Sequence, residues 1–242
     1  IIVVTNGTNT KPRIDDIHGI TNHLHTRDQG QCIATNIGAQ AVSPNTDYIM
    51  VVNSDMYFPK NWGKDLVNDD YLCFSPNLIE PENNAGSAIP FLKLDAGFTL
   101  DEFKPALVEE FVNQRTMMPE ADTTGFNLPF FIRIDVWDAI GGYDTKYDPW
   151  GSNSDTDLQT KIELAGIQPM RVREMMVYHF SNKSGTFDGT HMTEWWHNFD
   201  YYRDKWGFTR DDEPKPDTWM ATGMVNKELN KYHPDWEGKY AS

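Results

Sequence analysis

Cysteine is scarce in this sequence: Cys32 and Cys73 are the only two among 242 residues, and they form no CxxC pair. A disulfide scaffold needs several cysteines and a thiolate zinc site needs closely spaced ones, so neither is indicated. Such limited use of thiols permits a reducing compartment, and we expect a cytoplasmic protein.

Basic residues are also in the minority, with 21 Lys and Arg against 36 Asp and Glu, which gives a formal net charge of -15. So acidic a chain repels a phosphate backbone, which argues against sequence-independent binding of nucleic acid. An acidic protein can still bind a nucleotide where a metal ion bridges the negative charges. We therefore expect no nucleic-acid partner.

Long apolar runs are missing as well. No stretch approaches the roughly 20 apolar residues of a membrane span, and no charged-then-apolar signal segment is present. The hydrophobic share of 39% is that of a globular chain, which predicts one domain with an elaborated tail. Because Ile1 lies inside a strand-like run, we expect the natural N-terminus to lie upstream of it.

What the sequence does contain is a succession of short apolar runs that alternate with helical patterns, as in an α/β sheet. The predicted strands cover residues 1–4, 48–52, 71–74, 130–133 and 175–178. Helical spacing from Cys32 to Val42 lies between the first two strands, which predicts a β-α-β unit with parallel strands. Later patterns predict helices over 136–140 and 155–165, with Asp135 and Ser154 as their N-caps.

Polar residues follow the first two predicted strands, in the segments Thr5-Asn6-Gly7-Thr8-Asn9 and Asn53-Ser54-Asp55. Open parallel sheets bind ligands beyond the carboxyl ends of their strands. The Asp55 carboxylate suits Mg²⁺ or Mn²⁺, which proteins commonly hold through one or two carboxylates together with substrate phosphates. The alternative is that Asp55 only caps a turn before Pro59.

A further polar segment, residues 148–158, runs from a turn into an amphipathic helix. Asp155 and Asp157 lie in the first turn of that helix, where acids complement the helix dipole, and Ser154 with Asp157 resembles a capping box. We favour this structural interpretation for Asp157. Asp155 faces the other way around the turn, so it is either a general base in a cleft or another acid that complements the dipole.

His179 directly follows the last predicted strand. A neutral imidazole at this place can ligate the same metal ion or donate a hydrogen bond to a phosphate. The alternative is a structural hydrogen bond.

These features form an ordered series, completed by Ala34-Thr35-Asn36-Ile37-Gly38 and Ile140-Gly141-Gly142-Tyr143-Asp144. The series resembles the family 2 glycosyltransferases, nucleotide-sugar enzymes of the GT-A fold, over about residues 1–185. The resemblance implies a Rossmann-type mixed, mainly parallel sheet flanked by helices. It also implies a first strand before Ile1. Beyond the residues that it covers, we expect a C-terminal aromatic helical extension, residues 186–242, packed on the GT-A-like domain.

The resemblance implies roles for individual residues. Asp55 and His179 would bind Mn²⁺ or Mg²⁺, and Asp155 would be the catalytic base. Trp150 and Gly151 would form the turn on the acceptor side. The residues implied to contact the nucleotide-sugar donor are Thr5, Asn6, Asn9, Asn36, Asn53 and Ser54.

The activity implied is that of an inverting, metal-dependent glycosyltransferase of the hexosyltransferase type, with a glycan or glycoconjugate acceptor. Asn53 replaces the first acid of the family's Asp-x-Asp motif, and Ser154 replaces the glutamate before the base. The alternatives are a retaining GT-A transferase, a nucleotidyltransferase and, favoured by these two replacements, a catalytically inactive sugar-binding module.

Aromatic residues are concentrated near the C-terminus, at Trp195, Trp196, Phe199, Tyr201, Tyr202, Trp206 and Phe208. The segment has the character of a helix that docks on the main body. Its aromatic side chains either cover the edge of a core, which we favour, or form a surface on which sugars stack.

Overall fold

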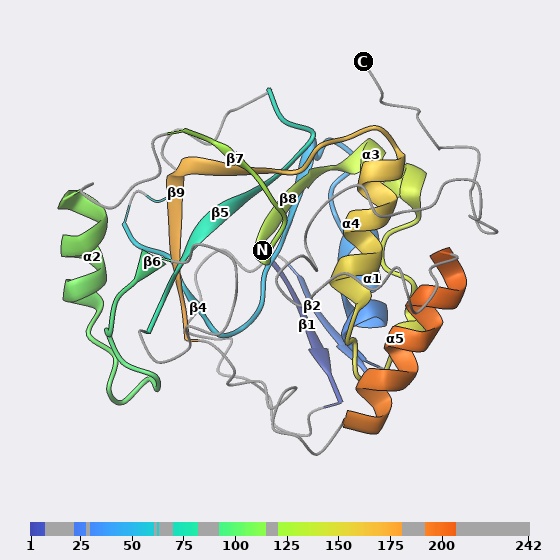
Figure 1. The fold of residues 1–242 in the computed structure, drawn as a ribbon, viewed down its shortest axis with the longest axis horizontal. Helices are drawn as coiled ribbons and strands as arrows, with labels where there is room; N and C mark the ends of the chain where they lie inside the picture. Colours follow the sequence, from blue (N-terminus) through green and yellow to red (C-terminus); the bar gives the residue numbers. More distant parts are fainter. Residues whose placement is uncertain are drawn as a thin grey trace.

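The computed structural model describes residues 1–7, 22–27, 30–60, 62, 70–81, 92–114, 121–180 and 192–206. Within these ranges the chain forms a mixed α/β structure with a seven-stranded sheet and a separate two-stranded sheet, flanked by helices (Figure 1). The predicted fold class is confirmed.

The elements follow one another from the N-terminus in a largely alternating order. The strands are β1 (Ile2–Asn6), β2 (Asn22–Thr26), β3 (Tyr48–Val51), β4 (Met56–Tyr57), β5 (Cys73–Glu80), β6 (Leu92–Lys93), β7 (Thr123–Thr124), β8 (Phe130–Arg133) and β9 (Met170–His179). The helices are α1 (Gln31–Gln40), α2 (Pro105–Gln114), α3 (Ile134–Ile140), the 3-10 helix η3 (Thr145–Tyr147), α4 (Ser154–Leu164) and α5 (Met192–Trp206).

Strand directions differ from the prediction of a mainly parallel sheet. The large sheet has the order β3-β8-β5-β9-β4, with β6 on β5 and β7 on β9. Only β5–β6 and β5–β9 are parallel in it, while β3–β8, β5–β8, β4–β9 and β7–β9 are antiparallel. The predicted parallel unit of β1 and β3 is also wrong among the described residues, because β1 pairs in parallel with β2.

The two central strands, β5 and β9, are longer than the apolar runs that predicted them. All eight residues of β5 are buried, including Pro76 and Asn77, where the register with β9 shifts. Pro76 has no backbone N–H to donate to the ladder. At this shift the Asn77 side chain donates to the carbonyl oxygen of Val172 at 2.8 Å, which adds a hydrogen bond between the two strands.

Both predicted N-caps lie one or two residues inside their helices. Arg133 precedes α3, and Asp135 lies in the first turn, where it forms a bidentate ion pair with Arg133. Asn153, in the left-handed conformation, precedes α4, and the Ser154 hydroxyl donates to the carbonyl oxygen of Gly151 instead of capping. The predictions of Asp135 and Ser154 as caps are therefore wrong, because each side chain has a closer partner upstream.

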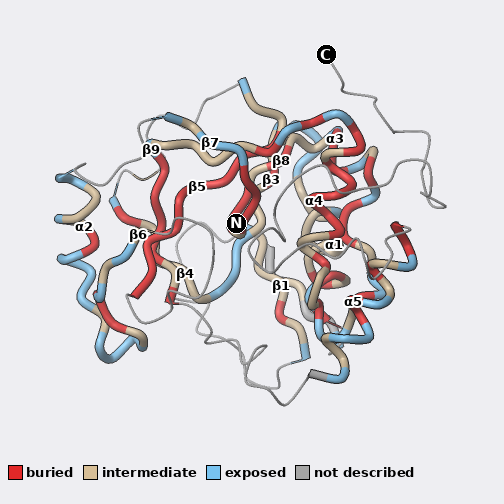
Figure 2. The backbone as a smooth tube through the Cα atoms, in the orientation of Figure 1, coloured by how far each residue is buried: buried red, intermediate tan, exposed pale blue. Residues whose placement is uncertain are grey.

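Within the described ranges, the core consists of two hydrophobic clusters. The larger joins β5 and β8 to α1, α3, α4 and α5, and its side chains include Phe130, Ile132 and Leu158. The smaller lies beside α2 and includes Ile79 and Tyr178, the neighbours of Glu80 and His179. Figure 2 shows the buried backbone concentrated in the central strands and in the helices over the larger cluster.

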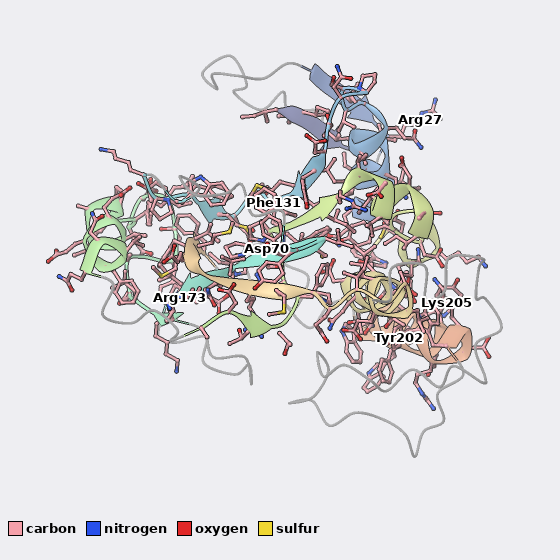
Figure 3. The ribbon with its side chains drawn as sticks, turned by 90° about the horizontal axis from the view of Figure 1, so that it is seen from above. Arg27, Asp70, Phe131, Arg173, Tyr202 and Lys205 are labelled. Atoms are coloured by element: carbon pink, nitrogen blue, oxygen red, sulfur yellow. The ribbon has the colours of Figure 1, made fainter. Side chains whose placement is uncertain are left out.

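Helix α5 docks on α4 and η3 through a buried polar network. Lys205 lies 2.7 Å from Asp144 Oδ2 and 2.8 Å from Asp157 Oδ1. The Trp206 indole also donates to Asp157, at 2.8 Å. Tyr202 and Lys205 are on the side of α5 that faces α4 (Figure 3). For Asp157 the structural interpretation holds, although its hydrogen-bond partners come from α5 and from Tyr147 of η3 and not from a capping box.

The aromatic side chains of α5 mainly cover the core, as favoured. Phe199, Tyr202 and Trp206 are buried, whereas Trp196 is 51% exposed. In the described part of the chain, no helix has both the length and the apolar character needed to cross a membrane.

Candidate functional site

The polar segment after β3 leads into β4, which pairs with the end of β9. Asn53 and Ser54 are exposed, and Asp55 is partly buried. Met56 then pairs with His179 in the antiparallel β4–β9 ladder, and the Asp55 carbonyl accepts a hydrogen bond from Phe180 N at 3.0 Å. This short ladder brings Asp55 beside His179, although more than a hundred residues separate them in the sequence.

Asp55, His179 and Glu80 form a chain of three side chains. Asp55 Oδ2 lies 3.4 Å from His179 Nε2, and His179 Nδ1 lies 2.6 Å from Glu80 Oε1. An ionised carboxylate only accepts hydrogen bonds, so Nδ1 donates to Glu80 and Nε2 faces Asp55. Glu80 was not predicted as a site residue, although it is an acid at the end of strand β5.

Asp55 and His179 shift each other's protonation, and Glu80 adds to the shift of His179. Burial alone would lower the pKa of His179, but its bonds to Asp55 and Glu80 outweigh burial and raise the pKa to about 9. The hydrogen bond with His179 lowers the pKa of Asp55. Without another cation, the two carboxylates therefore hold an imidazolium ion.

The donor atoms of Asp55 and His179 suit a divalent cation that takes most of its ligands from phosphate and water. Among the described residues, no group of three or more His, Cys, Asp and Glu side chains has the arrangement of a metal site. Asp55 and His179 offer one oxygen and one nitrogen, and Glu80 holds the histidine by its other nitrogen. Carboxylates commonly support metal-binding histidines in this way, and phosphate oxygens and water can complete the shell.

Asp155 lies at the start of α4 and is not bonded to Asp55, His179 or Glu80. Its Oδ1 accepts a hydrogen bond of 2.6 Å from the Tyr143 hydroxyl. Burial raises the pKa of Asp155, and the Tyr143 bond partly offsets that rise. The carboxylate is therefore a better proton acceptor than an exposed aspartate, and one of its oxygens has a fixed partner.

The predicted acceptor-side turn precedes Asp155. Trp150 is 39% exposed, whereas Gly151 is buried with a φ of 71°. The left-handed φ favours glycine at this position, and a Cβ there would also lie 2.8 Å from the Gln31 side chain. Asp148 accepts hydrogen bonds from the backbone of Cys32 and Ile33, which joins the turn to the first turn of α1.

The predicted donor-contacting residues have different surroundings. Thr5 is buried and Asn6 partly buried at the end of β1, and Asn9 lies outside the described residues. The Asn36 amide forms two hydrogen bonds, both with the backbone of Tyr143. It is thereby joined to Asp155 through Tyr143.

The structure brings four of the predicted site residues into two groups, Asp55 and His179 with Glu80, and Asn36 and Asp155 with Tyr143. In Figure 1, β9 ends and α4 begins on the lower side of the molecule, the side toward which β1 also runs. This side combines strand ends with the start of a helix.

Comparisons with known proteins show a likeness of fold. No family model matches the sequence, and no curated protein matches it. Among solved structures, the crystal structure of GalNAc-T7 with UDP, GalNAc and Mn²⁺ matches with a TM-score of 0.51 at 15% sequence identity. The match covers 74% of this chain and 37% of the GalNAc-T7 chain. The chain therefore has a GT-A-like fold, shared with a glycosyltransferase, and spans well under half of that chain's length.

Proposed function

We propose that this chain is an inverting, divalent-metal-dependent glycosyltransferase of the hexosyltransferase type. It would move a sugar from a nucleotide-diphosphate donor to a hydroxyl group of a glycan or glycoconjugate. The observation that carries the proposal is the pair of Asp55 and His179, 3.4 Å apart at a strand end. The support from outside the chain is the fold it shares with GalNAc-T7, which binds UDP, GalNAc and Mn²⁺.

Asp55 and His179 would hold Mn²⁺ or Mg²⁺, with Glu80 orienting the imidazole. When bound, such an ion supplies positive charge that stabilises a departing diphosphate. Asp55 provides the only carboxylate of the Asn53-Ser54-Asp55 segment. The exposed Asn53 and Ser54 would contact the donor, as would Thr5 and Asn6 at the end of β1 and Asn9, which lies outside the described residues.

Asp155 would act as the general base. Its Oδ1 is held by Tyr143, so Oδ2 would accept the proton of the acceptor hydroxyl. Attack on the anomeric carbon from the face opposite the diphosphate inverts that centre. Trp150 and Gly151, four or five residues before the base, would line the acceptor side.

The domain arrangement follows from the same proposal. Residues 1–185 would form the transferase unit, and residues 186–242 an extension whose helix α5 holds α4 and η3 together. Cys32 and Cys73 are free and buried, which suits a reducing compartment such as the cytoplasm.

The first experiment measures sugar transfer and hydrolysis with a panel of nucleotide-diphosphate sugars and Mn²⁺. We expect turnover of at least one donor, its loss in EDTA, and a product of inverted configuration. Full activity in EDTA would contradict the metal requirement, and retained configuration would indicate a retaining transferase. Sugar binding without turnover would favour a sugar-binding module.

The second experiment compares Asp155→Asn with Asp138→Asn. Asp138 is an exposed acid on α3, so its substitution makes the same chemical change away from the site. General-base catalysis contributes about 10²- to 10⁴-fold, and we expect a loss of kcat in this range only for Asp155→Asn. Equal activity of the two variants would remove Asp155 from the reaction.

A further inference from the structure

The segment Ile140–Asp144, Ile-Gly-Gly-Tyr-Asp in sequence, connects α3 to η3. Gly141 ends α3 in the left-handed conformation, and Gly142 follows with a φ of 60°. A Cβ at Gly142 would lie 2.6 Å from Asn36 Oδ1 and 2.8 Å from the Trp137 ring. Glycine at this position therefore lets the backbone approach the Asn36 side chain closely.

Asn36 holds the backbone of the next residue from both sides. Its Nδ2 donates to the Tyr143 carbonyl at 2.8 Å, and its Oδ1 accepts from Tyr143 N at 2.9 Å. The Tyr143 ring packs edge-on against Trp137, with ring centroids 5.9 Å apart. The ring is buried, with only 4% of Tyr143 exposed, so its direction is determined by the surrounding structure.

The Tyr143 hydroxyl is aimed at Asp155 and donates to Oδ1 at 2.6 Å. Burial, followed by the charge of Asp155, raises the pKa of Tyr143 well above its usual value, so the hydroxyl stays protonated and remains a donor. On α1, burial and then the charge of Asp148 raise the pKa of the Cys32 thiol, and the charge of Asp155 adds a smaller rise. The Tyr143 phenol is thus the neutral donor that binds the carboxylate.

We propose that Tyr143 is a positioning residue that binds Oδ1 of Asp155 and leaves Oδ2 to take the proton, and that Asn36 acts by holding Tyr143. This inference rests on the proposed function of Asp155 as general base. It gives Asn36 a role at the base instead of at the nucleotide. The Gly-Gly-Tyr segment is then part of the catalytic support and not only a helix end.

The primary test is Tyr143→Phe, which keeps the ring and removes the hydroxyl. The Asp155 carboxyl carbon is followed by ¹³C NMR titration, with its signal assigned by comparison with Asp155→Asn. Because the lost bond favours the charged carboxylate, we expect the pKa of Asp155 to rise in the variant. An unchanged Asp155 titration would overturn the proposal.

Tyr147→Phe is the matched control. The Tyr147 hydroxyl donates to Asp157 at 3.1 Å, so this variant removes a bond of the same type two residues from Asp155. We expect it to lower stability and to leave the Asp155 titration unchanged. An equal shift in both variants would show a general disturbance of α4 and would contradict a specific role for Tyr143.

Kinetics and binding separate the two roles of Asn36. In both Asn36→Ala and Tyr143→Phe, we expect kcat to fall about tenfold or more, the acid limb of the pH profile to move to higher pH, and the Kd for UDP with Mn²⁺ to change less than about threefold. A large rise in that Kd for Asn36→Ala, with a normal Asp155 titration, would restore the nucleotide-contact role. If the wild-type protein transfers no sugar, the proposed function fails, while the titration still decides whether Tyr143 controls Asp155.

Discussion

Asp55 shows how much one residue depends on its neighbours in space. In the sequence it is a lone acid after an apolar run, equally suited to a turn or a metal. In the structure its carboxylate meets His179, and Glu80 holds the far side of the same imidazole. Asn53, the residue in place of a second acid, is exposed in the turn. The metal interpretation therefore rests on Asp55 and His179.

Asp55→Ala should weaken Mn²⁺ binding far more than Asn53→Ala. We expect a loss of at least tenfold for Asp55→Ala, because even residues that only support metal ligands contribute about 10- to 100-fold. Asn53→Ala should change affinity less than about threefold. Titration of free Mn²⁺ by electron paramagnetic resonance measures both, and equal losses would show that the amide is an equivalent ligand.

Asp144 should make stability depend on pH in strongly acidic solution. Burial opposes ionisation, but the bonds from Lys205, the Lys146 backbone and Tyr201 outweigh it and lower the pKa to about 2. A carboxyl group whose pKa is lowered by folding stabilises the fold at pH values above its unfolded-state pKa. This stabilisation is lost as the pH falls through about 2.

Substitution of Asp144 by asparagine tests that dependence. Asp144→Asn should lower the free energy of unfolding by about 2 kcal/mol at pH 7, and the difference should shrink as pH falls from about 4 to 2. Urea unfolding at several pH values measures it. A difference that stays constant with pH would show that the charge of Asp144 contributes nothing.

Helix α5 shows the same dependence at the level of elements. Trp206, Tyr202 and Phe199 are buried, and Lys205 joins the acids of η3 and α4. Asn198 donates to the Tyr147 carbonyl at 2.9 Å and also reaches Ser152, in the turn after Trp150. Helix α5 thus contacts the chain at Asp144 and at Asp157, on either side of the acceptor-side turn and the candidate base Asp155.

Two tryptophans of α5 provide an internal comparison. Trp206 is 1% exposed and donates to Asp157, whereas Trp196 is 51% exposed. Trp206→Ala should lower the free energy of unfolding by about 3–5 kcal/mol, and Trp196→Ala by less than about 0.5 kcal/mol. Chemical unfolding followed by circular dichroism measures both. A small effect of Trp206→Ala would mean that the docking of α5 contributes little to the stability of the protein.

At the scale of the whole molecule, charge and proposed ligand oppose each other. The net charge is -15, and a nucleoside diphosphate is also negative. Salt screens such repulsion, since the Debye length falls to about 10 Å at 0.1 M. Binding of the diphosphate should therefore depend on salt in the direction opposite to that of a basic nucleotide-binding protein.

UDP affinity measured by calorimetry tests this balance. Without metal, we expect the Kd for UDP to decrease as salt rises from about 10 to 150 mM, because repulsion is screened. With Mn²⁺ the dependence should be weaker, since the ion neutralises part of the charge. A Kd that rises steeply with salt in the metal-free protein would show a local basic site that outweighs the net charge.

Local patterns predicted the class of the fold because burial imposes them on the chain. The strand Phe130–Arg133 was predicted with its true ends. The helix predicted to end before Gly141 does so, and Gly141 is in the left-handed conformation. Strand β2 and the first half of β9 were missed, because polar residues in Asn22–Thr26 and the arginines at 171 and 173 hide the strand pattern. Such segments become stable strands only when hydrogen bonds to neighbouring strands have formed.

By itself, the sequence determined an acidic α/β chain with acids and a histidine at strand and helix ends. It singled out Asp55, Asp155 and His179 as candidate site residues because strand ends and helix starts can be predicted from local periodicity. Only the tertiary structure decided that Glu80 holds His179, that Asn36 reaches Asp155 through Tyr143, and that Asp157 of α4 accepts hydrogen bonds from α5. These are contacts between residues far apart in the chain, whose partners depend on strand order and helix docking, and no local pattern encodes either.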